Sequence, residues 1–148
     1  MKQDPTDKTL DRFRSQLARN GLKATAQRIA VHEAMLSLGH ASADMVCDWL
    51  AENSETKVTV ASVYNVLTQL ASLGIYSNRL SSNNKMYFDV NTKKHIHMYD
   101  RENQVFKDVV DDQLYESLLQ KIGSRRFRGY TIENVDIQFV VRPTRRRL

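Results

Sequence analysis

Two histidines separated by one residue are the part of this sequence best suited to chemistry. In a β-strand, residues i and i+2 point to the same face, so His95 and His97 would present two imidazoles side by side. Asp89 precedes His95 by six positions, Asp108 follows His97 by eleven, and His40 stands alone far upstream. Imidazoles and carboxylates that converge on one point form a nitrogen and oxygen site suited to Fe, Mn, Zn or Ni. Two half-exposed strand histidines that bind nothing are the alternative.

Composition limits the kind of protein that could carry such a site. A chain of 148 residues is long enough for one ordinary domain or two small ones. No apolar run approaches the roughly 20 residues needed to span a membrane, and the polar start of the chain does not resemble a secretory signal. The single cysteine, Cys47, excludes an intrachain disulfide and a zinc site built on several thiolates, and its surroundings favour a buried helix position. These features together predict a cytoplasmic protein.

The distribution of charge suggests a partner. The formal net charge is +5, yet residues 12–32 and 56–88 contain no aspartate or glutamate at all. A face without carboxylates does not repel phosphates, and basic residues on it would release counterions on binding DNA. Arg28, Lys57 and Lys85 are the candidate phosphate contacts. Any basic patch must be local, because residues 1–90 hold ten basic and nine acidic residues, and a solvated charged face remains the alternative.

The first ninety residues predict a winged helix–turn–helix. Hydrophobic periodicity and stop signals indicate helices over 9–20, 25–39, 42–53 and 59–73, with Thr25, Ser42 and Thr59 as N-caps. Two strand-like runs, 75–80 and 85–90, flank a turn-rich loop suited to a hairpin. In such a fold the fourth helix enters the major groove of DNA. Its polar face supplies the remaining candidate DNA contacts, which are Ser62, Tyr64, Asn65, Thr68 and Gln69.

A second unit begins at about residue 91. Its pattern predicts a hairpin over 95–110, an amphipathic helix over 111–126 and a final strand over 130–143. About fifty residues are too few for a comfortable independent core, so we expect dimerisation through the sheet. The predicted fold class is therefore α+β, with a DNA-binding domain at 1–90 and a small α/β dimerisation and metal-sensing domain at 91–148. The basic tail Arg145-Arg146-Arg147 is interpreted as a solubilising terminus in preference to a phosphate contact.

Three segments resemble the ferric uptake regulator family, and the resemblance extends over nearly the whole chain. They are KATAQRIAV, HASADMVCDWL and VTVASVYNVLTQLASLGI, the last matching the recognition helix with Ser62 where threonine is usual. The resemblance implies a dimeric, metal-dependent transcription factor, usually a repressor, that binds a palindromic operator and is not an enzyme. It also implies a regulatory site for one divalent metal per subunit, Fe(II) or Mn(II) with Zn(II) possible. The implied ligands are His40, Asp89, His95, His97 and Asp108.

One proposed metal ligand, and two differences from the usual sequence pattern of the family, make the expected function more specific. Asp108 stands where iron-sensing members more often carry glutamate, which favours the peroxide-sensing branch, in which a ligand histidine such as His40 or His95 is oxidised. Asp100 and Asn103 occupy the positions of the family's first Cys-x-x-Cys pair, so no structural zinc is expected. The usual histidine cluster is also reduced, which argues against a second regulatory metal.

Three alternatives remain open from the sequence. Within the same family, the protein could sense iron, zinc, manganese or haem availability, because ligand type does not identify the metal. A metal-independent DNA-binding protein with vestigial histidines belongs to another class, and retention of all five ligand types argues against it. An enzyme lacks support, because no nucleophile and base stand out as a pair.

Overall fold

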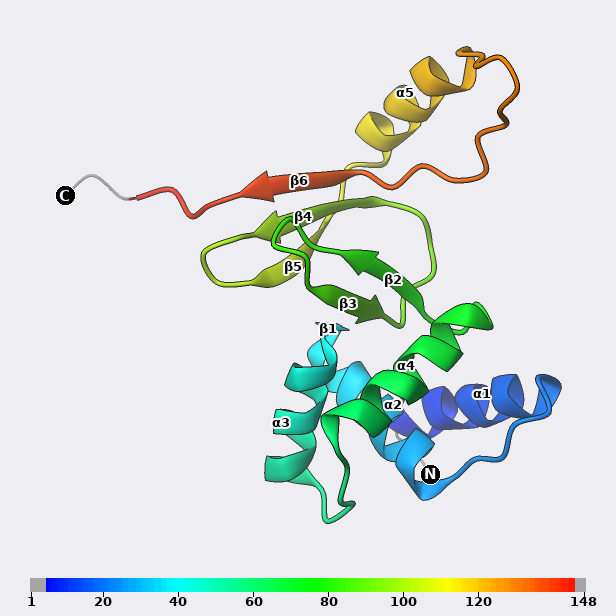
Figure 1. Ribbon diagram of the computed structural model, residues 1–148, viewed down its shortest axis with the longest axis vertical. Coiled ribbons are helices and arrows are strands. Elements are labelled where there is room, and N and C mark those ends of the chain that lie inside the picture. Colours follow the sequence, from blue (N-terminus) through cyan, green and yellow to red (C-terminus); the bar gives the residue numbers. More distant parts are fainter. Residues whose placement is uncertain (1–4, 146–148) are drawn as a thin grey trace. The chain divides into compact units, whose positions relative to one another are not determined.

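The computed structural model describes residues 5–145, and the chain divides into two compact units between Thr92 and Lys93 (Figure 1). Two arginines of the predicted basic tail, Arg146 and Arg147, lie outside the described residues. We describe unit 1, up to Thr92, and unit 2, from Lys93, separately. No helix among the described residues is long and apolar enough to span a membrane.

Unit 1 contains four helices, which are α1 (Pro5–Arg19), α2 (Ala26–Leu38), α3 (Ala43–Asn53) and α4 (Val60–Ser72). The predicted N-caps are confirmed, because the side chains of Thr25, Ser42 and Thr59 each accept a hydrogen bond from a backbone N–H three residues later. Each cap satisfies an amide that the first helical turn leaves without an intrahelical partner. The first helix starts four residues earlier than the predicted range, at Pro5, since proline is well tolerated in a first turn.

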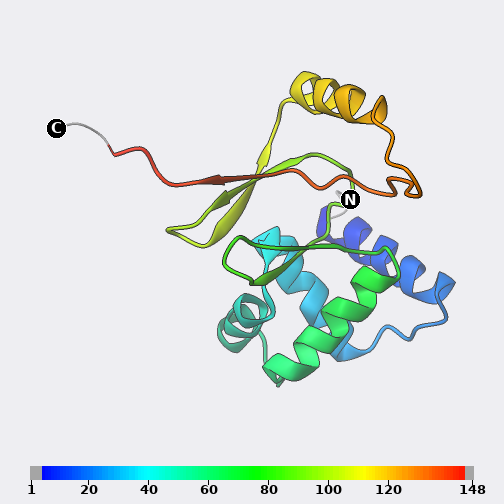
Figure 2. The same ribbon diagram turned by 45° about the horizontal axis from the view of Figure 1, so that its top comes forward.

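The sheet of unit 1 has the order β1-β3-β2 and is antiparallel throughout. Its strands are β1 (His40–Ala41), β2 (Ser77–Leu80) and β3 (Met86–Asp89), and both views show the four helices gathered on one side of them (Figures 1 and 2). The β2–β3 hairpin is the predicted wing. The short strand β1 was not predicted, and it places His40 directly opposite Asp89.

The core of unit 1 joins its helices to its sheet. The predicted apolar stripe of α4 is buried at Val63, Val66, Leu67 and Leu70, but Leu73 is 39% exposed because the helix ends there. The other apolar side chains of unit 1 with no exposed surface come from the other helices, from β1 and from β3; they are Phe13, Leu17, Val31, Ala34, Met35, Ala41, Val46, Leu50 and Phe88. Burial of this apolar surface holds the exposed polar face of α4 in place.

Unit 2 is a three-stranded sheet with one helix. Its elements are β4 (Ile96–Asp100), β5 (Val105–Val109), α5 (Asp112–Gly123) and β6 (Gln138–Val141), in the sheet order β5-β4-β6. The hairpin partners β4 and β5 are antiparallel, whereas β4 and β6 are parallel.

Two features of unit 2 differ from simple expectation. The predicted final strand, 130–143, shortens to the four residues of β6, because β4 offers only a short partner and pairs with it from His97 to Asp100. The amphipathic helix forms as predicted and is capped by Asp111, but none of its residues is buried within the described chain. An apolar helix face without cover is therefore a property of the isolated subunit.

Candidate metal centre and nucleic-acid interface

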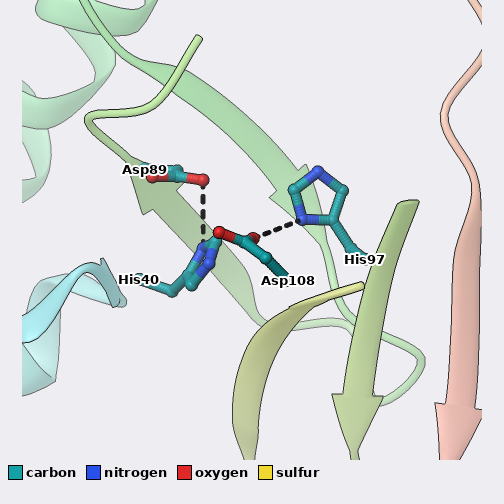
Figure 3. A group of neighbouring side chains, drawn as sticks. All are labelled: His40, Asp89, His97 and Asp108. Atoms are coloured by element: carbon teal, nitrogen blue, oxygen red, sulfur yellow. Dashed lines mark ion pairs between the residues drawn. The ribbon is translucent and has the colours of Figure 1, made fainter. Parts of the chain in front are cut away.

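In unit 1, the pairing of β1 with β3 brings one imidazole and one carboxylate together. His40 Nδ1 lies 3.2 Å from Asp89 Oδ2, and the two residues are neighbours across the strands (Figure 3). The other carboxylate oxygen, Asp89 Oδ1, accepts the backbone N–H of Asn91 at 2.8 Å. This second contact fixes the plane of the carboxylate, so that Oδ2 keeps its direction toward the imidazole. Both side chains are shielded from solvent, with exposed fractions of 12% and 4%.

In unit 2, a second group of donors lies on the β4–β5 hairpin. Asp108 is directly opposite His97, and its Oδ1 lies 3.6 Å from His97 Nδ1 and 2.6 Å from His95 Nε2 (Figure 3 draws the first of these contacts). The two imidazole centroids are 4.1 Å apart, as expected for residues i and i+2 of extended chain. His97 is almost fully buried and packs edge-on against Phe106. The hairpin therefore holds three donor groups within a few ångströms of one another.

The backbone fixes which nitrogen of His95 can act as a ligand. His95 Nδ1 makes a short hydrogen bond to the carbonyl of Lys93. A carbonyl only accepts, so Nδ1 donates to it, and Nε2 is the nitrogen that faces Asp108 and that would be left for a metal. An outer hydrogen bond of this kind is what orients metal-ligating histidines in general.

The donors fit a divalent first-row metal. The two groups supply imidazole nitrogens and carboxylate oxygens, and the residues drawn in Figure 3 are all able to ligate. This combination suits Fe, Mn, Zn or Ni better than a soft, thiolate-preferring ion. Cys47 is not available for such an ion, because it lies on α3 and the pKa of its thiol is raised by burial and by Asp44 and Asp48.

The turn after β4 does not fit thiolate-bound zinc. Asp100 Oδ1 accepts the backbone N–H groups of Glu102 and Asn103 at 3.0 and 3.1 Å, and Oδ2 accepts from the Asn103 amide at 2.7 Å. These hydrogen bonds, with the Asn103 side chain first, lower the pKa of Asp100. A carboxylate and an amide thus close the turn by hydrogen bonds at the two positions where thiolates would be needed.

The exposed face of α4 carries the candidate DNA contacts. Tyr64, Asn65 and Gln69 are exposed, and Lys57 is exposed just before the helix. Lys85, just before β3, is partly buried. No negative side chain interrupts this helix, so the surface accepts phosphates without like-charge repulsion.

Two of the predicted contact residues use their hydroxyls within the protein. Ser62 Oγ accepts from the Thr59 backbone N–H at 3.1 Å, donates to the Thr59 carbonyl at 2.9 Å and accepts from Gln27 Nε2 at 2.8 Å. Thr68 Oγ1 donates back to the carbonyls of Tyr64 and Asn65. A hydroxyl has one proton and two lone pairs, so Ser62 has no capacity left for a base.

Arg28 is anchored in the protein at two points. One guanidinium nitrogen donates to the Lys23 carbonyl at 2.9 Å, and the other donates to Gln69 Oε1 at 3.2 Å. Sequence reasoning placed Arg28 as a phosphate contact and missed Gln27 altogether. No local signal could have found either contact, because both join residues at least 35 positions apart.

A buried polar pair was also missed by the sequence reasoning. His32 Nδ1 lies 2.6 Å from the Tyr76 hydroxyl, and its ring stacks on Phe13 with the centroids 3.9 Å apart. Burial is the main cause that lowers the pKa of His32 to about 4, while a backbone hydrogen bond with Thr9 acts in the opposite direction. This histidine is thus neutral at ordinary pH and belongs to the core of unit 1.

Comparisons with known proteins agree with this arrangement. The model of the ferric uptake regulator family matches residues 19–140. None of the curated protein sequences gives a match. The structure is similar to that of the Vibrio cholerae ferric uptake regulator, with a TM-score of 0.74, 21% identity, and coverage of 88% of this chain and 98% of that one.

Two further solved structures show the same fold. The Pseudomonas aeruginosa ferric uptake regulator with manganese has a TM-score of 0.67 and 24% identity, covering 88% of this chain and 97% of that one. A zinc uptake regulator complexed with zinc and DNA has a TM-score of 0.64 and 17% identity, covering 95% and 94%. At these identities the likeness establishes the winged-helix and small α/β architecture alone.

Proposed function

This chain belongs to the ferric uptake regulator family of transcription regulators, and we propose that it is a dimeric, cytoplasmic repressor. It binds palindromic operator DNA when a divalent metal is bound. The observation that carries the proposal is the pair of prearranged donor groups, His40 with Asp89 and His95 with His97 and Asp108. Structures of similar fold are described with manganese, and with zinc and DNA.

We propose that one metal per subunit, Fe(II) or Mn(II) with Zn(II) possible, is held by all five donors. Two of them belong to unit 1 and three to unit 2. Occupancy of both groups by one ion would favour a single angle between the units over all others, since a ligand shifts a conformational equilibrium by its differential affinity. That angle would set the spacing of two α4 helices to match the two half-sites of an operator.

A homodimer accounts for the apolar surface of unit 2. A groove of about 750 Å³ beside α5 is lined by the apolar residues Leu119, Ile122, Phe127, Ile132 and Val135 together with Arg125, Arg126 and Arg128, and Phe127 is 57% exposed. The edge strand β6 is partly apolar as well, with Val140 49% exposed. Exposed apolar side chains bordered by charged ones are typical of a subunit interface. We propose that a second copy covers it and that apolar packing, without structural zinc, holds the dimer.

A response to peroxide is the form of sensing that Asp108 favours. A bound Fe(II) would activate peroxide there. One peroxide oxygen would enter a ring C–H bond of a ligand histidine, the other would leave as water, and the histidine ring would supply the two electrons. Of the two candidates, His40 in unit 1 and His95 in unit 2, His95 has its Nε2 directed at Asp108. Oxidation of the ring would weaken it as a ligand and release the DNA. Sensing of metal availability alone is the alternative outcome.

Metal analysis combined with DNA binding tests the proposal. We expect about one Fe or Mn per subunit in protein purified anaerobically, and we expect selection from a random duplex library to enrich a palindrome only with metal present. Asp108→Asn should reduce both metal content and DNA binding. Asp112→Asn removes a similar carboxylate from the exposed first turn of α5 and should change neither. Equal DNA binding with and without metal would instead identify a metal-independent DNA-binding protein.

A further inference from the structure

We propose that Arg28 fixes the direction of the Gln69 carboxamide, so that Gln69 offers only N–H donors to the DNA and selects guanine at one operator position. The inference rests on the proposed DNA-binding function and specifies how α4 distinguishes bases. It assigns Gln69 to base recognition and Arg28 to positioning.

The contact between the two side chains determines the orientation of the amide. Arg28 donates to Gln69 Oε1 at 3.2 Å. A guanidinium carries donors and no acceptor, so the amide atom that faces it must be the oxygen. Gln69 is exposed, and its Nε2, with two N–H donors, is the atom of the amide left for a partner outside the protein.

Arg28 is itself held firmly enough to act as a positioning residue. It follows the N-cap Thr25 by three residues, and its backbone N–H donates to the Thr25 hydroxyl at 3.2 Å. Its other guanidinium nitrogen donates to the Lys23 carbonyl at 2.9 Å. The side chain is only partly exposed, and these contacts at both guanidinium nitrogens restrict its rotamers. The start of α2 thus provides a rigid support for Gln69.

A second hydrogen bond between α2 and α4 restricts the rotation of α4 about its own axis. Gln27, adjacent to Arg28, donates to the Ser62 hydroxyl at 2.8 Å. Ser62 and Gln69 are seven residues apart, which is two turns of helix, so both lie on the side of α4 that faces α2. The contacts of Ser62 and Gln69 with α2 lie on the same side of α4, and together they restrict its rotation. Gln69 therefore keeps a constant angle to whatever lies against α4.

The other polar side chains on this face of α4 limit which residues can contact a base. The hydroxyls of Ser62 and Thr68 are engaged within the helix, and Ser72 Oγ donates to the Gln69 carbonyl at 2.7 Å. Among the uncharged polar side chains of α4, the Tyr64 ring with its hydroxyl and the amides of Asn65 and Gln69 remain available, and only the amide of Gln69 is held by an arginine among the described residues.

The hydrogen-bonding groups of the bases then determine which base Gln69 prefers. A free glutamine pairs with adenine, since it accepts from N6 and donates to N7. The contact with Arg28 turns the Gln69 oxygen toward α2, so the N–H groups are what the amide directs away from the protein. In the major groove, guanine presents two acceptors, O6 and N7, whereas adenine and thymine present one acceptor each and cytosine presents a donor. A carboxamide that directs its two N–H groups at the bases therefore favours guanine.

The test is selection from a random duplex library, using the full chain with Mn(II), followed by titration of single-base operator variants. Wild type should prefer guanine at one position of each half-site by on the order of tenfold, the scale of one base contact. Gln69→Glu should reverse this preference in favour of cytosine or adenine, because a carboxylate paired with Arg28 leaves an acceptor. Arg28→Lys retains the charge but cannot make both contacts, and it should raise adenine to at least the level of guanine.

Asn65→Asp is the matched control, since it adds the same charge to the same exposed face without an arginine partner. It should weaken binding to all sequences and leave the guanine preference unchanged. Far-ultraviolet circular dichroism should show that all the variants fold. An unchanged guanine preference in both Gln69→Glu and Arg28→Lys would overturn the inference while the proposed function stands. No selective enrichment by wild type would contradict both.

Discussion

Acidification of the protein should reveal the buried histidine of unit 1. His32 is 4% exposed, stacks on Phe13 and pairs with the Tyr76 hydroxyl. Burial lowers its pKa from 6.5 to about 4. The unfolded chain therefore binds a proton between pH 6.5 and pH 4 that the folded chain does not bind. Stability is complete above pH 6.5, and it falls as the pH is lowered through this window.

The size of the effect follows from the shift. Each pKa unit corresponds to about 1.36 kcal/mol, so protonation of His32 should cost the folded state about 3 kcal/mol by pH 4. Small domains have total stabilities of only about 5–15 kcal/mol, so such a loss is easily measured. A comparison between variants removes the contribution of every other ionisable group.

The double variant His32→Phe with Tyr76→Phe isolates this contribution. It replaces both partners by rings of similar shape, so neither member of the His32–Tyr76 pair is left without the other, and such a replacement is close to neutral for stability. We expect it to match wild type at pH 7.5 and to lose about 3 kcal/mol less by pH 4. Single His32→Phe leaves the Tyr76 hydroxyl without its partner, so it should be about 1–3 kcal/mol less stable than the double variant at every pH in this range.

Urea unfolding with fluorescence detection provides the measurement. The single tryptophan, Trp49, lies on α3 and packs against the core of unit 1, so its emission reports on this unit. A chelator should be present throughout, so that metal binding does not contribute to stability. The reasoning would be refuted if wild type and the double variant lost the same free energy of unfolding between pH 7.5 and pH 4.

Four further outcomes are expected. Tyr64→Ala, on the exposed face of α4, should weaken operator binding by about 1–3 kcal/mol in gel-shift titrations at fixed salt, and unchanged affinity would reject this face as the DNA contact. Strong chelation should reduce DNA binding but leave a dimer in light scattering; monomers would show that metal has a structural task. Asp100→Ala should lower the melting temperature by opening the turn after β4, and an equal change in Asn103→Ala would support the shared hydrogen bonds as the cause. Peroxide should add one oxygen to a peptide containing His40 or His95 in the Fe(II) form and not in the Mn(II) form, whereas oxidation of Cys47 alone would contradict peroxide sensing.

Local signals explain which elements could be predicted from the sequence. The caps Thr25, Ser42 and Thr59 act on amides three residues away, so the starts of α2, α3 and α4 follow from short stretches of sequence. Strand β1 has two residues and exists only because β3, almost fifty residues later, pairs with it. The final strand was predicted too long because alternating apolar residues do not form a strand where no partner strand runs beside them.

The candidate site divides in the same way. The donor residue types, and the side-by-side placement of His95 and His97, follow from the sequence and its resemblance to a family. Their contacts with Asp108 depend on the β4–β5 register, which puts His97 opposite it. The contact between Arg28 and Gln69 depends on the packing of α2 and α4, since these residues are 41 positions apart. Tertiary contacts of this kind leave no periodic trace in a sequence.

The parallel pairing of β4 with β6 has a consequence for how unit 2 folds. His97 pairs with Gln138, so β5 and α5 lie between the two paired strands in the chain. The third strand, β6, can therefore join the sheet only after both of them have been synthesised. Contacts of such large sequence separation form slowly, because the cost of closing the loop comes before any gain. Until β6 arrives, the hairpin with His95, His97 and Asp108 is a two-stranded ribbon, which is marginally stable in water. On the ribosome, unit 1 should therefore fold before β6 has been synthesised and added to the β4–β5 hairpin. In a nascent chain halted before residue 138, the amides of this hairpin should not be protected from hydrogen exchange.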